Sequence, residues 1–128
     1  MTRCAFALLA CAMFAASAPA QTTVQRGFPA NALRGEITFG QPPELKLNGQ
    51  AARLSPGARI RGRDNLLQMS AALQGQSAVV HYVVDPLGLV RDVWILTDAE
   101  RARQPWPRTP REAQSWAFDP VAQTWTPR

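Results

Sequence analysis

From residue 35 onward, polar and apolar positions alternate with the two-residue period of β-strands. Residues 36–39 and 44–47 alternate clearly, and residues 59–61 form another short run of the same kind. Asn48-Gly49 follows the second run and is typical of a hairpin turn, because both residues tolerate positive φ angles. Ser55-Pro56-Gly57 is expected to break the chain after residue 54. The pattern therefore predicts a domain made mainly of short strands.

The strongest pair of strands is predicted at residues 77–84 and 89–96, which are rich in valine and other apolar residues. The Asp85-Pro86-Leu87-Gly88 segment between them suits a tight turn that ends in a left-handed glycine. Such a turn places Val84 opposite Val90, and the pairs that follow are then Tyr82 with Asp92, Val80 with Trp94 and His81 with Val93. Because both faces of this hairpin are largely apolar, it is expected to lie centrally.

The residues after this hairpin predict a helix and then an extension. Thr97 and Glu100 have the spacing of a capping box, so a short helix is expected to run to about Arg103 and to end at Gln104-Pro105. Residues 105–110 are polyproline-like and are interpreted as a linker. Residues 116–127 are similar in their aromatic and turn positions to the second hairpin of the protein G immunoglobulin-binding domain. That similarity implies a local shape in which Trp116 faces Trp125, with Phe118 on the same side.

These elements predict an all-β fold, a small barrel or sandwich of about five to six strands with one short helix. A Pro/Trp-rich C-terminal extension with a hairpin follows it. The expected organisation is a flexible lead-in at 21–34, a small β domain at 35–103 and the extension at 104–128.

Residues 1–20 have the pattern of a signal peptide: a charged start, a short apolar run and small residues before a cleavage site after Ala20. The expected location is therefore periplasmic or secreted. A lipoprotein acylated at Cys11 is the alternative. Cleavage removes both cysteines, so the mature chain is expected to have no disulfide and no thiol chemistry. No stretch after Ala20 is apolar enough to predict a membrane span.

The net charge and the small number of metal-ligating residues limit the ligands and the reactions that the chain can be expected to support. Without Arg3 the chain has 13 Lys+Arg against 9 Asp+Glu, a modest net charge of +4. After cleavage the chain has one histidine and no cysteine, so no metal site and no cofactor are predicted. His81 is the one candidate catalytic base. A register slipped by one residue would make His81 and Asp92 cross-strand neighbours, but the turn favours the other register, so no catalytic residue is assigned.

Two groups of residues are candidate contact surfaces. Alternating arginines could meet an anion or a partner, or could form a solvated strand face that guards a sheet edge: Arg53, Arg59, Arg61 and Arg63. Nucleic acid is disfavoured, since no aromatic residues interleave with them. A second group could be an exposed contact surface or could cover the barrel: Trp106, Trp116, Phe118 and Trp125.

Three segments, 47–60, 64–66 and 85–97, resemble a family of short exported proteobacterial proteins without an assigned function. The resemblance covers roughly residues 28–101. It implies a common small domain and a periplasmic setting, and it carries no catalytic residues to transfer.

The leading hypothesis is a non-enzymatic binding module of the cell envelope, which contacts an anionic envelope component or another periplasmic protein. Its contact surface would be the arginine-lined strand face or the aromatic tail. The alternatives are a small hydrolase or ligand-modifying enzyme centred on His81, and a structural subunit of an envelope complex. The fold by itself does not choose among them.

Overall fold

The computed structural model describes residues 25–128. The predicted signal peptide, its cleavage after Ala20 and the alternative acylation at Cys11 lie outside the described residues. The described chain forms these elements: β1 (Leu33–Phe39), β2 (Glu44–Leu47), β3 (Gln50–Arg61), β4 (Leu67–Gln68), the 3₁₀ turn η1 (Ser70–Leu73), β5 (Ser77–Val84), β6 (Val90–Ile95), α1 (Asp98–Arg101), α2 (Pro110–Ser115), β7 (Ala117–Asp119) and β8 (Thr124–Thr126).

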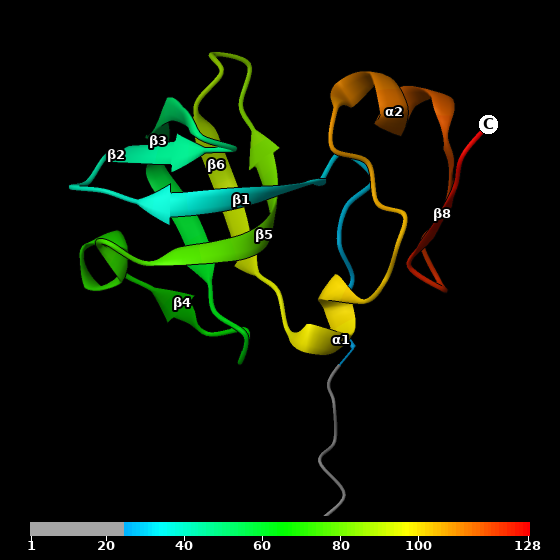
Figure 1. The fold of residues 1–128 in the computed structure, drawn as a ribbon, viewed down its shortest axis with the longest axis horizontal. Helices are drawn as coiled ribbons and strands as arrows, with labels where there is room; N and C mark the ends of the chain where they lie inside the picture. The colour runs from blue at the N-terminus through cyan, green and yellow to red at the C-terminus, as the bar shows by residue number, and fades with distance from the viewer. Residues whose placement is uncertain (1–24) are drawn as a thin grey trace, which may run out of the picture.

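The first six strands form a closed five-stranded barrel with one additional strand (Figure 1). β1 pairs antiparallel with β2 and β5, β2 pairs with β3, and β5 pairs with β6. A parallel pairing of β3 with β6 closes the ring, and β4 adds to the opposite edge of β3. This strand order is that of the OB-fold, a small Greek-key barrel. The predicted all-β small barrel is confirmed.

Local turn chemistry explains two of the hairpins. Asn48 and Gly49 have φ angles of 53° and 81°, which joins β2 to β3 as the sequence predicted. In the turn between β5 and β6, the Asp85 carboxylate accepts hydrogen bonds from the backbone N–H groups of Leu87 and Leu89, and Gly88 has a φ of 83°. Both turns therefore lie where their residues predicted them.

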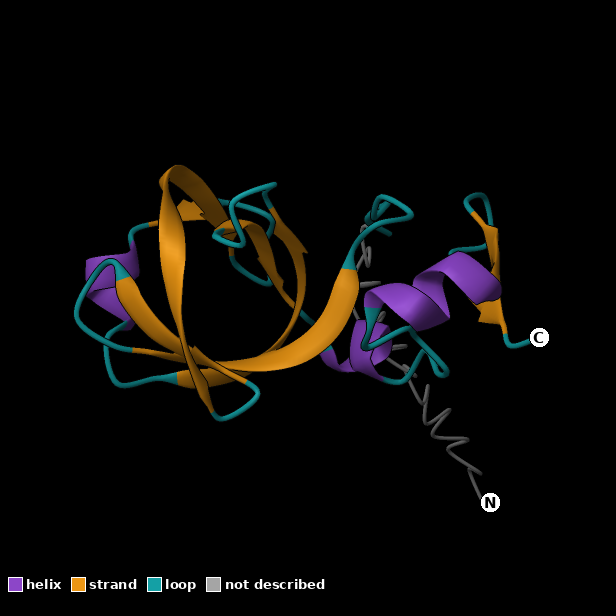
Figure 2. Ribbon diagram, turned by 90° about the horizontal axis from the view of Figure 1, so that it is seen from above, coloured by secondary structure: helices purple, strands orange, loops and turns teal. Residues whose placement is uncertain are grey.

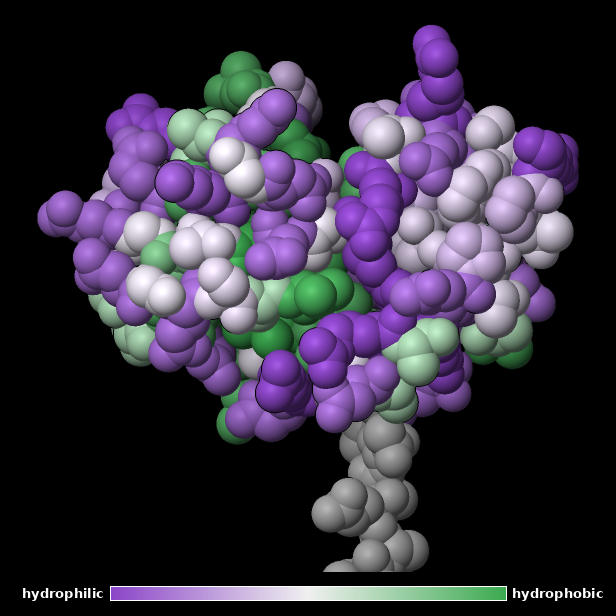
Figure 3. Space-filling view, viewed as in Figure 1, coloured by the Kyte–Doolittle hydropathy of each residue, from purple (hydrophilic) through white to green (hydrophobic). Residues whose placement is uncertain are grey.

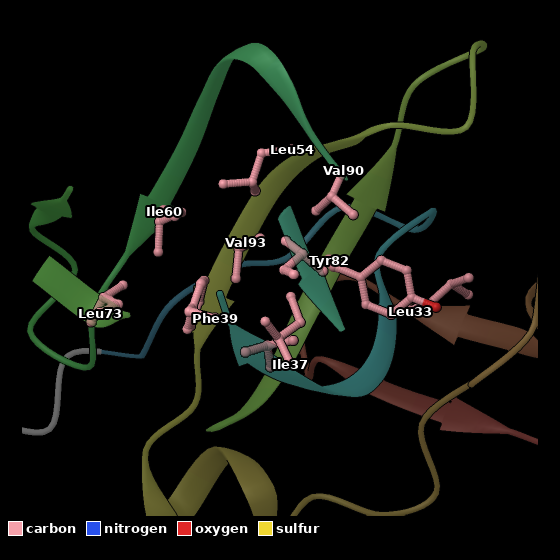
Figure 4. Close-up of a cluster of buried hydrophobic side chains, with 11 residues drawn as sticks. Leu33, Ile37, Phe39, Leu54, Ile60, Leu73, Tyr82, Val90 and Val93 are labelled. Atoms are coloured by element: carbon pink, nitrogen blue, oxygen red, sulfur yellow. The ribbon is translucent and has the colours of Figure 1, made fainter. Parts of the chain in front are cut away.

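The barrel interior is filled by apolar side chains from every barrel strand (Figure 4). Ile37, Val80 and Val93 are fully buried near its centre, and Tyr82 packs among them from β5. Burial of each such side chain contributes roughly 1.5–3 kcal/mol. Among the described residues, this barrel core consists of Leu33, Ile37, Phe39, Leu45, Leu54, Ile60, Leu73, Val80, Tyr82, Val90 and Val93.

The register of the β5–β6 hairpin differs from the prediction beyond its first pair. Val84 lies opposite Val90 as expected, but Val83 lies opposite Asp92, so Arg91 is an extra residue in β6. This bulge shifts every later pair by one, and His81 faces Trp94 instead of Val93. The predicted pairs Tyr82 with Asp92 and Val80 with Trp94 are therefore wrong.

β3 also differs from its prediction, because the chain does not break at Ser55-Pro56-Gly57. The strand runs through this segment and bends there. Its pairing with β6 steps from Leu54–Val90 directly to Arg59–Asp92, so residues 55–58 bulge out of the ladder. Pro56 and Gly57 are tolerated at this place since a bulge needs fewer ladder hydrogen bonds.

The C-terminal segment holds a second helix, α2, that the sequence analysis did not predict; it begins at Pro110, the last residue of the predicted linker. Thr109 caps it: the Thr109 hydroxyl accepts a hydrogen bond from the backbone N–H of Glu112, and Pro110 is the first helical residue. The predicted aromatic hairpin is present as β7 and β8. However, Phe118 lies opposite Trp125, with ring centroids 4.6 Å apart, so the predicted pair of Trp116 with Trp125 is wrong.

A second core joins this C-terminal segment to the outer face of β5 and β6. It contains Phe28, Ala32, Val83, Leu96, Trp106 and Trp125. Figure 2 shows the barrel at one end of the molecule and the C-terminal helices and hairpin at the other. The two apolar faces of the β5–β6 hairpin thus pack against two different cores. This explains why the sequence pattern is apolar on both faces.

Part of the segment before β1 is packed, whereas the sequence predicted a flexible lead-in at 21–34; the structure describes this segment from residue 25. Arg26 and Phe28 are buried although neither lies in a helix or strand. The backbone N–H of Phe28 donates to the side-chain Oε1 of Gln123 at 2.9 Å. This link ties the lead-in to the C-terminal hairpin 95 residues away.

Candidate functional site

The barrel wall has a gap beside the bend of β3. On the side of β3 that faces away from β6, residues 50–53 pair with β2 and residues 60–61 pair with β4. The stretch between them opens onto a groove of about 570 Å³. The groove is lined by Pro42, Pro43, Leu54, Ser55, Gly57, Ala58, Arg59, Ile60, Leu67, Gln68, Met69 and Ser70.

Large apolar side chains are exposed at the rim of this groove. Leu67 is 62% exposed and Met69 is 75% exposed, and the neighbouring Leu66 is exposed as well. β4 is the last strand of the sheet order, so its outer edge is unpaired among the described residues. Exposed apolar side chains beside a free strand edge are typical of a surface that receives another chain.

The four predicted arginines do not form one shared site. Arg59 lines the groove, while Arg53 forms an exposed ion pair with Glu44 across β2 and β3 at 2.7 Å. Arg61 donates to the carbonyl of Asn65 in the following turn. Arg63 lies beyond the end of β3 and donates to the carbonyl of Leu96. Arg59 is therefore the member of this group that faces the groove.

A buried arginine and the single histidine form a polar contact between the two cores. Arg34, 4% exposed, directs Nε and Nη2 at Nε2 of His81, at 3.3 and 3.2 Å. Its remaining N–H groups donate to the backbone carbonyls of Glu100, Arg101 and Arg103 after the start of α1. Arg34 thus holds the chain that leaves α1 against the barrel.

His81 is held neutral by its surroundings. Burial, followed by the nearby guanidinium groups of Arg34 and Arg26, lowers the pKa of His81 to about 2. Its ring stacks on Trp106 with centroids 4.1 Å apart and meets Phe28 edge-on at 4.4 Å. Because Nε2 accepts from Arg34, the proton lies on Nδ1, which has no hydrogen-bond partner.

The His81–Asp92 dyad considered in the sequence analysis is not formed. The bulge at Arg91 places both residues on the outer face of the hairpin, but His81 lies opposite Trp94 and Asp92 lies opposite Val83. Asp92 accepts a hydrogen bond from Arg91 at 3.0 Å. The imidazole therefore packs and accepts a hydrogen bond at this position.

A second buried arginine fixes α1 from its other side. Arg26 forms a bidentate pair with Glu100, with N–O distances of 2.9 and 2.5 Å, and also donates to the carbonyls of Gly62 and Ile95. Burial raises the pKa of Glu100, but hydrogen bonds from Arg26 and Thr97 outweigh it and hold this pKa below its usual value. Glu100 is therefore ionised at neutral pH.

The predicted aromatic group is divided between the second core and its rim. Trp106 and Trp125 are buried, and the Trp106 indole donates to the carbonyl of Ala32 at 2.9 Å. Trp116 and Phe118 are half-buried. Most of this group thus covers the barrel, which is one of the two alternatives that the sequence left open.

A second pocket lies on the seam between the barrel and the C-terminal segment. Its volume is about 490 Å³, and Figure 3 shows hydrophilic side chains gathered along this seam. The pocket is lined by Arg34, Gln104, Pro105, Trp106, Arg108, Glu112 and Trp116. Two guanidinium groups thus share one small hollow with two indoles.

Sequence reasoning missed Arg26, Arg34 and Arg108. Nothing in the local pattern marks Arg26 or Arg34, because their partners lie 36–74 residues away along the chain. The Thr109-Pro110 pair with Glu112 does carry the signature of a helix start. That signature predicts a helix that starts directly after Arg108.

Within residues 25–128, no cluster of three or more His, Cys, Asp or Glu side chains could hold a metal ion. In the same part of the chain, no helix combines the length and the hydropathy required to cross a membrane.

The chain was compared with known proteins at three levels. No protein-family model, no curated protein and no solved structure matches it.

Proposed function

We propose that this protein is a non-enzymatic binding module of the cell envelope that takes up an extended, acidic segment of another exported protein. The observation that carries the proposal is the groove beside β4, where exposed Leu67 and Met69 adjoin a free strand edge. A sheet edge binds an extended peptide through main-chain hydrogen bonds, and neighbouring apolar surface accepts its alternate side chains.

The charge of the groove favours an acidic partner. Arg59 is the one charged side chain among the described residues that line it. A carboxylate on the incoming segment would pair with Arg59, whereas a lysine would be repelled. Electrostatic complementarity of this kind contributes mainly to partner choice, and the apolar contacts contribute most of the affinity.

The assignment to the envelope rests on the signal-peptide pattern of residues 1–20 and on the family resemblance. We expect mass spectrometry of the protein isolated from cells to give a chain that begins at Gln21. A chain that still carries Met1, or one that begins with an acylated Cys11, would contradict this part of the proposal.

Peptide binding is tested with two defined probes, a ten-residue peptide in which Val and Asp alternate and a matched peptide of Val and Lys. In an NMR titration of the ¹⁵N-labelled protein, the acidic peptide should shift the amides of Leu67, Gln68 and Arg59, with a Kd on the order of 100 μM. The lysine peptide should bind at least tenfold more weakly.

Met69→Asp should weaken binding of the acidic peptide at least tenfold, because it puts a negative charge beside the incoming carboxylates. Val121→Asp is the matched control, since Val121 is also largely exposed and lies on the C-terminal hairpin. Equal binding of the two peptides, or equal losses in the two variants, would overturn the proposal.

A further inference from the structure

The seam pocket contains a buried positive charge without a carboxylate partner. The donors of Arg34 are all directed at three backbone carbonyls and the neutral His81, and the nearby Glu100 carboxylate is paired with Arg26. Carbonyl oxygens satisfy the hydrogen bonds of a guanidinium but do not neutralise its charge. Arg34 is therefore a buried cation whose positive charge is not compensated by a paired carboxylate.

A second guanidinium lies close to the first. Burial lowers the pKa of Arg34, Arg108 lowers it further, and Glu100 raises it. Arg108 is exposed and lines the same pocket. Two cations placed against one hollow repel each other, and an anion between them would relieve that repulsion.

The pocket also presents free hydrogen-bond donors. No residue within 25–128 forms a hydrogen bond with the guanidinium of Arg108, the side-chain amide of Gln104 or the indole N–H of Trp116, and all three residues line the pocket. These three groups reach the pocket from the loop before α2 and from the end of α2. They supply the directional contacts that the fully engaged Arg34 cannot supply.

We propose that this pocket is a binding site for a compact organic anion, a carboxylate or phosphate group carried on a small ring. The anionic group lies between Arg108 and the buried charge of Arg34, and the ring lies against the half-buried indole of Trp116. A hollow of about 490 Å³ is within the range of small-molecule sites. This site is separate from the peptide groove and does not depend on it.

Glu112 is the one carboxylate among the described lining residues, and it limits the charge that the pocket favours. With Arg34 and Arg108 it leaves one net positive charge. An anionic ligand is therefore favoured over a neutral one, and a sugar acid with one negative charge is a suitable first probe.

The test titrates the full protein with glucuronate, glucose 6-phosphate and glucose, and follows tryptophan fluorescence, because Trp106 and Trp116 line the pocket. Glucuronate is expected to change the emission with a Kd on the order of 1 mM, and glucose is expected to give no saturable change. Tighter binding of glucose 6-phosphate would also support the site and would identify phosphate as the anionic group.

Arg108→Gln should weaken binding of the charged sugar at least tenfold. Arg111→Gln is the matched control, because Arg111 is also exposed, lies on α2 and does not line the pocket. Its effect should stay below twofold, and both variants should keep the melting temperature of the parent. Saturable binding of glucose with the same Kd, equal effects of the two variants, or no response to either anion up to 20 mM would overturn the proposal.

Discussion

Arg34 and His81 stabilise each other because each supplies what the other lacks in the interior. The neutral imidazole offers an acceptor to the guanidinium, and the guanidinium prevents a second positive charge from forming on the ring. Protonation of His81 would remove this acceptor and would place a third cation beside Arg34 and Arg26. The fold therefore requires the uncharged form of the histidine.

We expect a loss of stability as the pH falls below 6.5. The folded-state pKa of His81 is about 2, well below the unfolded value of 6.5, so the unfolded chain takes up the proton first. The stabilisation is complete above pH 6.5 and decreases by about 1.4 kcal/mol for each pH unit below it. Urea unfolding at pH 7.5 and 5.5 should show a difference of about 1.4 kcal/mol.

His81 is the one histidine of the chain, so no other imidazole titrates in this window. The variant His81→Gln should be less stable at both pH values but should lose the difference between them. An unchanged pH dependence in this variant would assign the acid sensitivity to another group.

The roles of residues that form turns or helix caps with the neighbouring backbone could be predicted from the sequence. Asn48-Gly49 and Gly88 form the turns that their residue types favour, and Thr97 caps α1 as expected. The role of Arg34 could not be predicted, because its hydrogen bonds depend on how β1, β5 and the end of α1 meet in space.

At the scale of elements, α1 is only four residues long and depends on its surroundings. Its capping box satisfies the first turn, and Arg26 and Arg34 hold it from two sides. Such a short helix has little stability of its own. The two arginines therefore contribute more to its position than its own backbone hydrogen bonds do.

We predict that Glu100→Gln destabilises the protein by about 3 kcal/mol, because it leaves the buried Arg26 without a counter-charge. Asp98→Asn is the matched control on the same helix. Asp98 pairs with Arg101 at the exposed surface, where an ion pair contributes less than about 1 kcal/mol. If both variants lose the same free energy of unfolding in urea, the buried Arg26–Glu100 pair contributes no more to stability than the exposed pair does.

The registers of both hairpins show what a sequence pattern does not determine at this scale. The Asp85 turn fixed the first pair of β5 and β6, but the bulge at Arg91 shifted the remainder. A bulge leaves no clear sequence signal when both faces of a hairpin are apolar, since either register then buries apolar side chains. In the aromatic hairpin the predicted partner of Trp125 was wrong by two residues, because Trp116 and Phe118 are both aromatic and the pattern does not distinguish them.

At the scale of the whole molecule, two cores share the β5–β6 hairpin. The barrel core lies on one face of it, and the aromatic core formed with Phe28, Trp106 and Trp125 lies on the other. The all-β barrel could be predicted from strand patterns and turns. The closure by β3 and β6, and the packing of the tail on the barrel, depend on contacts between distant parts of the chain.

We predict that Trp125→Ala destabilises the whole protein by about 3–5 kcal/mol, the usual cost of removing a buried aromatic side chain. Thermal unfolding followed by circular dichroism measures the effect. Val121→Ala in the same hairpin is the control and should change stability by less than about 0.5 kcal/mol, because Val121 is exposed. A loss confined to the hairpin, with an unchanged barrel transition, would contradict a shared second core.

The hydrogen bond between Phe28 and Gln123 has a consequence for folding during synthesis, because its two residues are made far apart in time. A ribosome delivers Phe28 among the first described residues and Gln123 near the last, so the outer face of β5 and β6 stays partly uncovered until the C-terminal segment has been made. A nascent chain in this state offers apolar surface to a holding chaperone. A premature stop codon before residue 104 should therefore yield an aggregating product instead of a shorter folded one.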